Sequence, residues 1–166
     1  MKPSRAARYY YLRFLRLKDD PVILARGVAI GIFIGITPTL PLHTLLIIFF
    51  ASILRGNLIT ALLSATVVSN PFTFVPQYYF SWFAGNLLLP GKLSWERIRT
   101  TLDLLLSDLS FGESLSAIAH LGRDALLVMV LGGILLALPF SLAGYVLSLK
   151  LFVKIRNKRR QKHVLF

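Results

Sequence analysis

The sequence predicts an all-α, multi-pass membrane protein with two proline-broken helical hairpins, re-entrant or spanning, and a C-terminal transmembrane helix. Mean hydropathy is +0.68 and only 16% of the residues are charged, whereas a soluble domain carries about 25% charge. Two apolar stretches interrupted by prolines follow each other between residues 26 and 90. An unbroken apolar run at 125–149 would form a helix of about 37 Å, which is long enough to cross a hydrocarbon core of about 30 Å.

The charge distribution predicts how the chain sits in the membrane. The net charge is +12, and seven Lys/Arg residues fall in each of the terminal regions 1–26 and 150–162. Basic blocks beside apolar runs mark the cytoplasmic side and favour contact with anionic lipid headgroups. We therefore expect an inner-membrane protein with both termini in the cytoplasm, anionic membrane lipids as partners, and no nucleic-acid partner. The chain has no cysteine, which excludes disulfides and thiol chemistry, and its length fits a single membrane domain, 1–166.

The N-terminal part of this domain is a basic amphipathic segment, 1–20. Aromatic and arginine side chains separate onto two faces of a helix at 4–18, which is typical of a helix lying on an anionic leaflet. A soluble amphipathic cap is the alternative interpretation. Asp20-Pro21 then predicts the start of a helix, because Asp caps free N–H groups and Pro fits the first helical position.

The membrane core is expected at 21–89. Its first helix, 21–36, spans only about 24 Å, and its glycines recur every fourth residue, which makes a smooth face for another helix. These glycines are Gly27, Gly31 and Gly35. The prolines that follow at 38 and 41 cannot lie inside a helix. A second short helix is therefore expected at 42–54, and the pair suggests a re-entrant hairpin.

The second half of the core repeats this broken pattern. Arg55-Gly56-Asn57 predicts a tight turn, a helix follows at 58–68, and Asn70-Pro71 breaks it. An aromatic-rich segment, 72–89, completes the core, with Pro76 expected to interrupt its start. Paired interrupted helices point to binding sites in transporters built from repeats, although the side chains of the two halves here match poorly.

The remainder of the chain predicts one more crossing. Residues 90–124 read as an amphipathic segment on the outer side, with an apolar stripe that runs from Trp95 to Leu109 at helical spacing. A transmembrane helix follows at 125–149, in which Gly132-Gly133 and Pro139 are candidate kinks, and a basic tail occupies 150–166. With both termini cytoplasmic, residues 21–89 must cross an odd number of times, as one re-entrant hairpin and one broken crossing would do.

The motifs of residues 21–89 resemble a bacterial membrane family known as domain of unknown function 2062. The resemblance lies in Ala29-x-Gly31-x-Phe33-x-Gly35 leading to Pro38, in Pro41-Leu42-His43-Thr44, in Arg55-Gly56-Asn57 and in Ser69-Asn70-Pro71. Pro41 and Leu42 stand where the family pattern often has a glycine before the histidine. The resemblance implies a multi-pass inner-membrane protein. Some family members are fused to glycosyltransferases that act on polyprenyl-phosphate lipids, which suggests the handling of lipid-linked sugars or phospholipids.

No catalytic constellation is visible, so we expect no enzyme, no metal and no cofactor. The histidines are far apart, and no carboxylate lies within 21–89. What remains is a set of polar, cationic and loop-shaping residues in an apolar setting, which are candidates to bind an anionic headgroup or to shape the loops: Arg26, Thr37, Pro38, Pro41, His43, Arg55, Asn57, Asn70, Pro71 and Gln77. The alternative is that the polar ones satisfy backbone groups that the prolines leave free.

The leading functional hypothesis is a small transporter or flippase-like protein for an anionic lipid or a lipid-linked sugar. In this hypothesis the loops at 37–44 and 69–77 face each other across a cavity, and Arg26 or Arg55 pairs with a phosphate. The alternative is a non-catalytic membrane scaffold or partner of a polyprenyl-phosphate glycosyltransferase, with the stripe at 93–109 binding that partner. The sequence is also compatible with a homo-oligomer.

Overall fold

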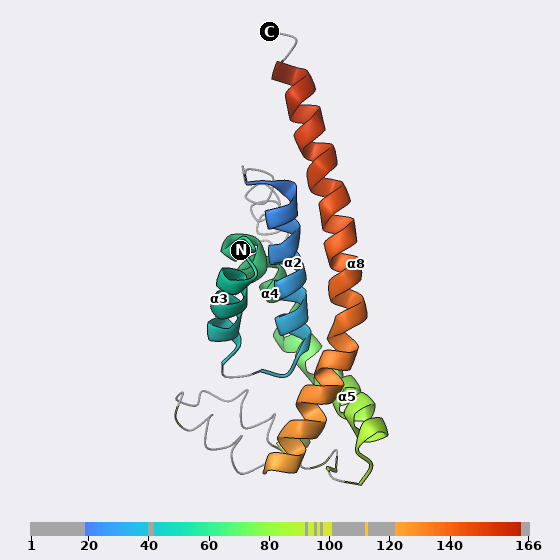
Figure 1. Cartoon of the computed structure of the whole chain (residues 1–166). Helices are drawn as coiled ribbons and strands as arrows, with labels where there is room; N and C mark the ends of the chain where they lie inside the picture. The colour runs from blue at the N-terminus through green and yellow to red at the C-terminus, as the bar shows by residue number, and fades with distance from the viewer. Residues whose placement is uncertain are drawn as a thin grey trace.

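The computed structural model describes residues 19–39, 42–91, 93–94, 96, 98–100, 112 and 122–163, and all regular structure in them is α-helical. The helices in chain order are α2 (Pro21–Ile36), α3 (His43–Ile53), α4 (Leu58–Val68), α5 (Pro71–Leu88) and α8 (Arg123–His163) (Figure 1). The all-α fold class is thereby confirmed. The interfacial helix expected at 4–18, Pro41, and most of the stripe from Trp95 to Leu109 lie outside the described residues.

Helix α2 forms the centre of the bundle and packs against α3, α4 and α8. It begins as the sequence predicts, because the Asp20 side chain accepts a hydrogen bond from the Val22 N–H at 2.9 Å and Pro21 takes the first position. It ends at Ile36, where the Thr37 hydroxyl donates to the Phe33 carbonyl at 2.8 Å. Most of its residues are buried, because neighbouring helices cover it on several sides.

The glycine face of α2 lies against α4, which runs in the same direction. A Cβ at Gly31 would lie 2.1 Å from the Ala61 carbonyl oxygen, so the two backbones touch. Two hydroxyls of α4 donate across this contact: Thr60 to the Leu24 carbonyl at 3.0 Å and Ser64 to the Val28 carbonyl at 3.2 Å. The predicted packing role of the glycines is therefore confirmed, and the close approach allows side chain–backbone hydrogen bonds between the helices.

The predicted tight turn joins α3 to α4. Arg55 has φ of 51°, in the left-handed region where glycine is the usual residue. The next residue, Gly56, donates its N–H to the Ala51 carbonyl at 2.9 Å. A Cβ at Gly56 would meet the Ile30 side chain at 2.8 Å and the Gly27 nitrogen at 3.1 Å. The glycine is therefore needed at 56 for close packing on α2, while Arg55 takes the strained backbone position.

Helices α4 and α5 meet at the Ser69-Asn70 break with a bend of 87°. Pro76 does not interrupt α5, which is continuous from Pro71 to Leu88, so this expectation was wrong. The missing N–H of Pro76 would have bonded to the carbonyl of residue 72, in the first turn of the helix. The proline therefore removes a single bond near the helix start and leaves the turns beyond it intact.

Helix α8 is longer than predicted. It runs for 41 residues, through Gly132-Gly133 and Pro139, and continues to His163 instead of ending near Leu149 (Figure 1). The basic tail is thus helical over most of its length. Phe152 anchors it by packing against Leu24 and Val28 of α2.

An ion pair also joins the extension of α8 to the start of α2, since Arg156 donates to Asp20 at 3.0 Å. The Val22 N–H and, after it, the Arg156 guanidinium lower the pKa of the exposed Asp20 carboxyl. Stabilisation from these contacts is therefore fully present above the ordinary pKa of an aspartate, and it is lost as the pH falls through the lowered value.

Helix α8 also crosses α5 at close range. A Cβ at Gly132 would lie 1.8 Å from the Ser81 carbonyl oxygen, and a Cβ at Gly85 would lie 2.0 Å from the Val128 carbonyl oxygen. Gly133, the next residue, faces Pro38 and Thr37 at the end of α2. The glycine pair expected to kink the helix therefore lets α8 contact α5 on one side and the α2 end on the other.

Candidate functional site

The candidate residues do not converge on one site. Arg26, Arg55 and Asn57 lie near the start of α2, because the α3–α4 turn packs on Gly27. Those near the other end of α2 are Thr37, Pro38, His43, Asn70, Pro71 and Gln77. Arg26 is eleven residues from Thr37 along a helix, or about 16 Å. A phosphate held by either arginine would therefore lie well away from the helix breaks that follow Ile36 and Val68.

The polar side chains in the second group bond to nearby backbone groups or, for His43, to the Thr39 hydroxyl. The Asn70 carboxamide oxygen accepts from the Phe72 N–H at 3.0 Å, and its amino group donates to the Val67 carbonyl at 3.2 Å. The Val68 carbonyl accepts from the Thr73 hydroxyl at 2.7 Å and from the Gln77 amide at 2.9 Å. These bonds satisfy the carbonyls that the break at Ser69-Asn70 leaves free, as an apolar setting requires.

The remaining members of the second group have similar roles. Thr37 is buried and closes the last turn of α2. The Thr39 hydroxyl and His43 Nδ1 are joined by a hydrogen bond of 3.2 Å, which ties the loop to the start of α3. Pro38 lies against Gly133 of α8. This group therefore shapes and caps the helix ends, which is the structural alternative that the sequence left open.

Replacing Asn70 is therefore expected to act on stability. Asn70→Ala removes the cap of α5 and should lower the free energy of unfolding by about 1 kcal/mol. Asn70→Ser should recover most of this loss, because serine is a comparable cap. Thermal unfolding of the detergent-solubilised protein measures both, with Asn157→Ala on an exposed turn of α8 as the matched control. An Asn70→Ala variant as stable as the control would contradict a capping role.

The first group contains two free cations beside an apolar groove. Asn57 is a cap, since its side chain accepts from the Thr60 N–H at 2.8 Å and its amide donates to Asp19. Arg26 and Arg55 are exposed, and neither forms an ion pair with another described residue. Neighbouring residues in the sequence line a groove of about 280 Å³, whose walls come from α2, the α3 end and α8: Ala29, Ile30, Phe33, Ile34, Phe50, Leu54 and Ser141.

The backbone positions of the arginines are next to residues that line one end of this groove. Arg26 is one helical turn before Ile30 on α2, and Arg55 directly follows Leu54 at the end of α3. The helices run antiparallel, so their ends meet where Gly56 contacts Gly27. The two arginines were candidates from sequence, but the groove was not, because its walls come from segments far apart in the chain.

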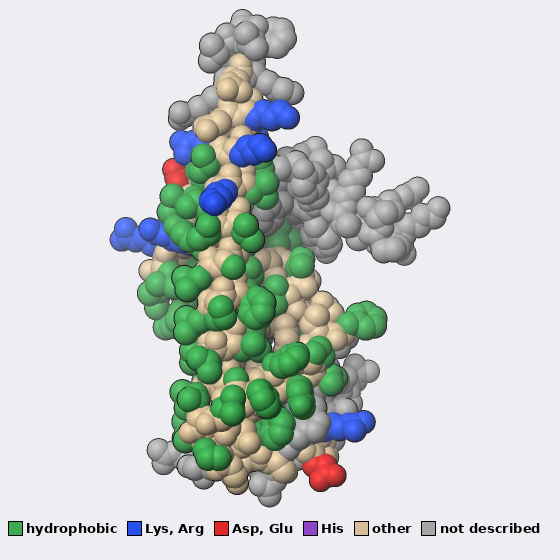
Figure 2. Space-filling view, turned by 90° about the vertical axis from the view of Figure 1, so that its right-hand side faces the viewer, with side chains coloured by type: hydrophobic (Ala, Val, Ile, Leu, Met, Phe, Trp, Pro, Cys, Tyr) green, Lys and Arg blue, Asp and Glu red, His purple; other side chains and the backbone are tan. Residues whose placement is uncertain are grey.

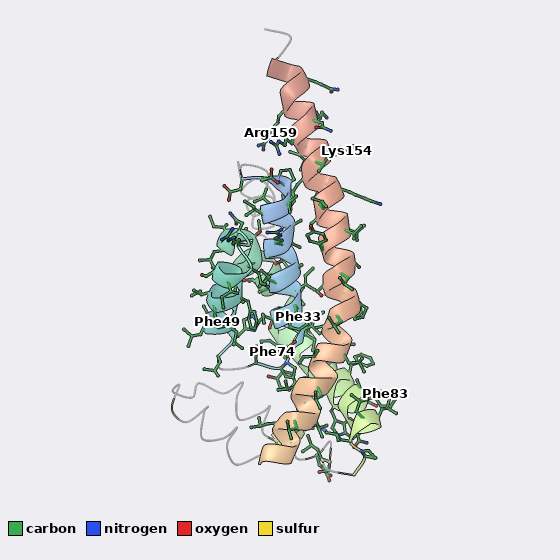
Figure 3. All side chains as sticks on the ribbon, in the orientation of Figure 1. Phe33, Phe49, Phe74, Phe83, Lys154 and Arg159 are labelled. Atoms are coloured by element: carbon green, nitrogen blue, oxygen red, sulfur yellow. The ribbon has the colours of Figure 1, made fainter. Side chains whose placement is uncertain are left out.

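Apolar side chains cover much of the outer surface of the helices. Exposed large hydrophobic residues occur on α3, α4, α5 and α8, and Phe72 is 92% exposed. Figure 2 shows one face of the molecule, where hydrophobic side chains gather over most of the helices and most Lys and Arg side chains lie toward one end. A soluble monomer rarely exposes so continuous an apolar surface. Phe33, Phe49, Phe74 and Phe83 are labelled in Figure 3 and show how aromatic side chains are spread along the bundle.

Fold and surface together define a small all-helical protein in which α8 is long and apolar enough to cross a membrane. Helices α4 and α5 reach that length and composition only when they are taken together as one bent pair. Within the described residues, no three His, Asp or Glu side chains are placed to hold a metal ion. The chain belongs to the bacterial family described as "Uncharacterized protein conserved in bacteria (DUF2062)", whose sequence profile matches residues 4–161. Neither the curated proteins nor the solved structures contain a significant match to it.

Proposed function

We propose that the chain is a multi-pass bacterial inner-membrane protein that binds and moves an anionic lipid or a lipid-linked sugar. The observation that carries this proposal is the apolar groove between α2 and α3 with Arg26 and Arg55 at its end. The proposal assigns no catalytic step and no cofactor to the chain.

The helix directions support a multi-pass arrangement. In this proposal α2 and α3 form a re-entrant hairpin of about 24 Å and 17 Å, each shorter than a hydrocarbon core of about 30 Å. The bent pair α4–α5 forms one crossing, and α8 returns. The Asp20–Arg156 ion pair supports a common side for the two basic terminal regions, which is the cytoplasm by their charge.

The groove suits part of a lipid chain. Its lining is apolar apart from Ser141, whose hydroxyl is already bonded to the Leu138 carbonyl at 3.0 Å. A hydrocarbon segment in the groove would replace contacts with bulk lipid, so it adds little affinity by itself. The guanidinium groups of Arg26 and Arg55 would supply the specificity, because arginine binds phosphate through paired charge-assisted hydrogen bonds.

Lipid retention after gentle purification tests the proposal. We expect mass spectrometry to find one anionic lipid enriched over its membrane proportion, and we expect Arg26→Ala and Arg55→Gly each to lower that enrichment by about fivefold or more. Arg55→Gly is a sharp variant, because it removes the guanidinium while glycine relieves the left-handed backbone at this position. Any loss of lipid can then not be attributed to a strained fold.

Arg99→Ala is the matched control, since Arg99 is exposed and lies beyond α5 at the far end of the bundle. It should retain the wild-type lipid profile. Lipid in bulk membrane proportions, unchanged in both arginine variants, would overturn the proposal.

The second candidate function is a membrane scaffold for a polyprenyl-phosphate glycosyltransferase, alone or as a homo-oligomer. The internal use of Asn70, Thr73 and Gln77 favours it, because these side chains have backbone partners and need no ligand. The stripe at 93–109 that was expected to bind this partner gives no support where it is described. Ile98 and Leu93 are buried against α5 and α8, so they are not available to a partner. An unchanged lipid profile in the experiment above would favour this second function.

A further inference from the structure

The C-terminal end of α8 extends beyond the other helices of the bundle. Its basic residues begin at Lys150, and the fourteen residues from there to His163 extend the helix by about 21 Å. Figure 1 shows this end extending past α2, α3, α4 and α5. Phe152 packs on α2, and Arg156 pairs with Asp20, the cap of α2. Most other described side chains of this extension are exposed, so they are accessible to a partner.

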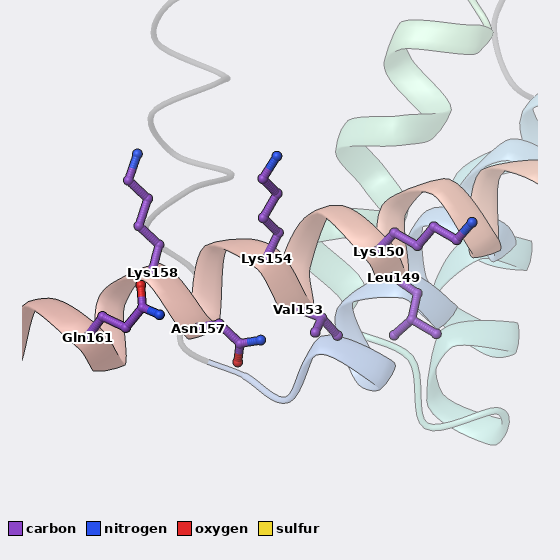
Figure 4. Close-up of a pocket in the computed structure, with 7 residues that line it drawn as sticks. All are labelled: Leu149, Lys150, Val153, Lys154, Asn157, Lys158 and Gln161. Atoms are coloured by element: carbon purple, nitrogen blue, oxygen red, sulfur yellow. The ribbon is translucent and has the colours of Figure 1, made fainter.

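Two parallel rows of side chains lie along one face of the extension. Figure 4 shows Lys150, Lys154 and Lys158 in one row, each four residues from the next. The adjoining row is uncharged, aliphatic near the bundle and amide-bearing farther out: Leu149, Val153, Asn157 and Gln161. Both rows line a groove of about 730 Å³. We call these seven residues the lysine face.

The lysine face has no counter-charge on its own helix. The sequence contains no Asp or Glu after Asp124. The Arg156–Asp20 pair lies outside this face, because residue 156 is not part of either row. Lysines four residues apart on a helix repel each other, so an acidic ligand that neutralises them would stabilise the extension as well as bind to it.

We propose that the lysine face is a docking surface for an acidic amphipathic segment of a partner protein. A row of glutamates would pair with the lysines, and apolar and amide side chains would contact the uncharged row. An anionic lipid surface would also attract these lysines, so the experiment below separates a partner segment from a lipid surface. The proposal is independent of any lipid site at Arg26 and Arg55.

The test uses the full chain in phosphatidylcholine nanodiscs and a synthetic helical peptide with glutamates at every fourth position beside a row of leucines. We expect the peptide to bind more tightly than a scrambled peptide of the same composition. Lys154→Glu/Lys158→Glu should weaken binding by about tenfold or more, from the loss and reversal of two charge pairs. Val153→Gln should also weaken it, because the uncharged row contributes apolar contact.

Arg159→Glu provides the matched control. Arg159 is exposed, and Figure 3 shows it on the other side of α8 from Lys154, so its reversal should change peptide binding by less than about twofold. Equal losses in the Arg159 variant and in a Lys154→Glu variant would overturn the proposal by showing diffuse electrostatics. Binding of phosphatidylglycerol vesicles without any preference for the ordered peptide would overturn it in favour of a lipid surface.

Discussion

Gly31→Ala should destabilise the protein by about 2 kcal/mol, although alanine is the better helix former. The added Cβ would lie 2.1 Å from the Ala61 carbonyl oxygen and from the Ser64 hydroxyl. Because the first of these atoms is backbone, α2 and α4 must move apart. That shift weakens the hydrogen bond from Ser64 to the Val28 carbonyl. Overpacking of this kind costs about 1–3 kcal/mol, more than the gain of about 1 kcal/mol from helix propensity.

Gly35→Ala is the matched control on the same helix face. Its Cβ would have no neighbour nearer than 3.4 Å, at Ala65 and Val68, which is ordinary contact. The same gain in helix propensity should then leave the protein as stable as wild type or up to about 1 kcal/mol more stable. Thermal unfolding midpoints in one detergent compare the two variants. Equal midpoints for them would contradict the close contact between α2 and α4.

The sequence predicts local features of this fold well. The expected helix at 58–68 matches α4, and Asp20-Pro21 and Asn70-Pro71 mark helix starts because capping acts within a few residues. The glycine repeat of α2 predicts a packing face. It does not identify α4 as the partner, because that choice depends on contacts distant in sequence.

Two structural features had signals within the sequence that the predictions did not use. Asn70 and Thr73 have the spacing of a capping box, which predicts a structural role for Asn70 before any ligand is considered. The region after Leu149 has no Gly or Pro and is rich in Lys and Arg, which favours continuation of the helix. The end of an apolar run marks the end of a membrane span and not the end of a helix.

The groove beside Arg26 and Arg55 had no such signal. Its walls come from α2, α3 and, through Ser141, α8. Gly27 and Gly56 set the distance between the first two helices, and that distance is a property of the packed bundle. The residues were therefore predictable as cations at helix ends, whereas their association with an apolar groove was not.

Gly132→Ala should separate α5 from α8 and cost about 2 kcal/mol or more. The new Cβ would lie 1.8 Å from the Ser81 carbonyl oxygen and 2.5 Å from the Gly85 nitrogen, both backbone atoms. The buried cluster of Tyr78, Val128 and Met129 spans this crossing and would lose contacts with it. Overpacking against two backbone groups cannot be relieved by a side-chain rotation, so the cost should lie toward the upper part of the usual range of about 1–3 kcal/mol.

Trp82 reports this separation directly. It packs against the same cluster, and its indole N–H donates to the Leu93 carbonyl at 2.8 Å. The chain has two tryptophans, so a Trp95→Phe background leaves Trp82 as the single tryptophan. In that background, Gly132→Ala should shift native emission to longer wavelength as Trp82 becomes more exposed, whereas Gly31→Ala should lower stability without moving the emission.

Gly144→Ala is the control on α8, since its Cβ would meet only the flexible end of the Ile32 side chain at 2.3 Å, with the next atom at 3.7 Å. A rotamer change of Ile32 can relieve that contact, so both stability and emission should stay close to wild type. If Gly132→Ala behaves like Gly144→Ala in both measurements, α5 and α8 do not cross at Gly132. A Gly132→Ala variant that loses stability and shifts the emission, beside an unaffected Gly144→Ala, locates the crossing at Gly132 and shows that this contact holds α5 on α8.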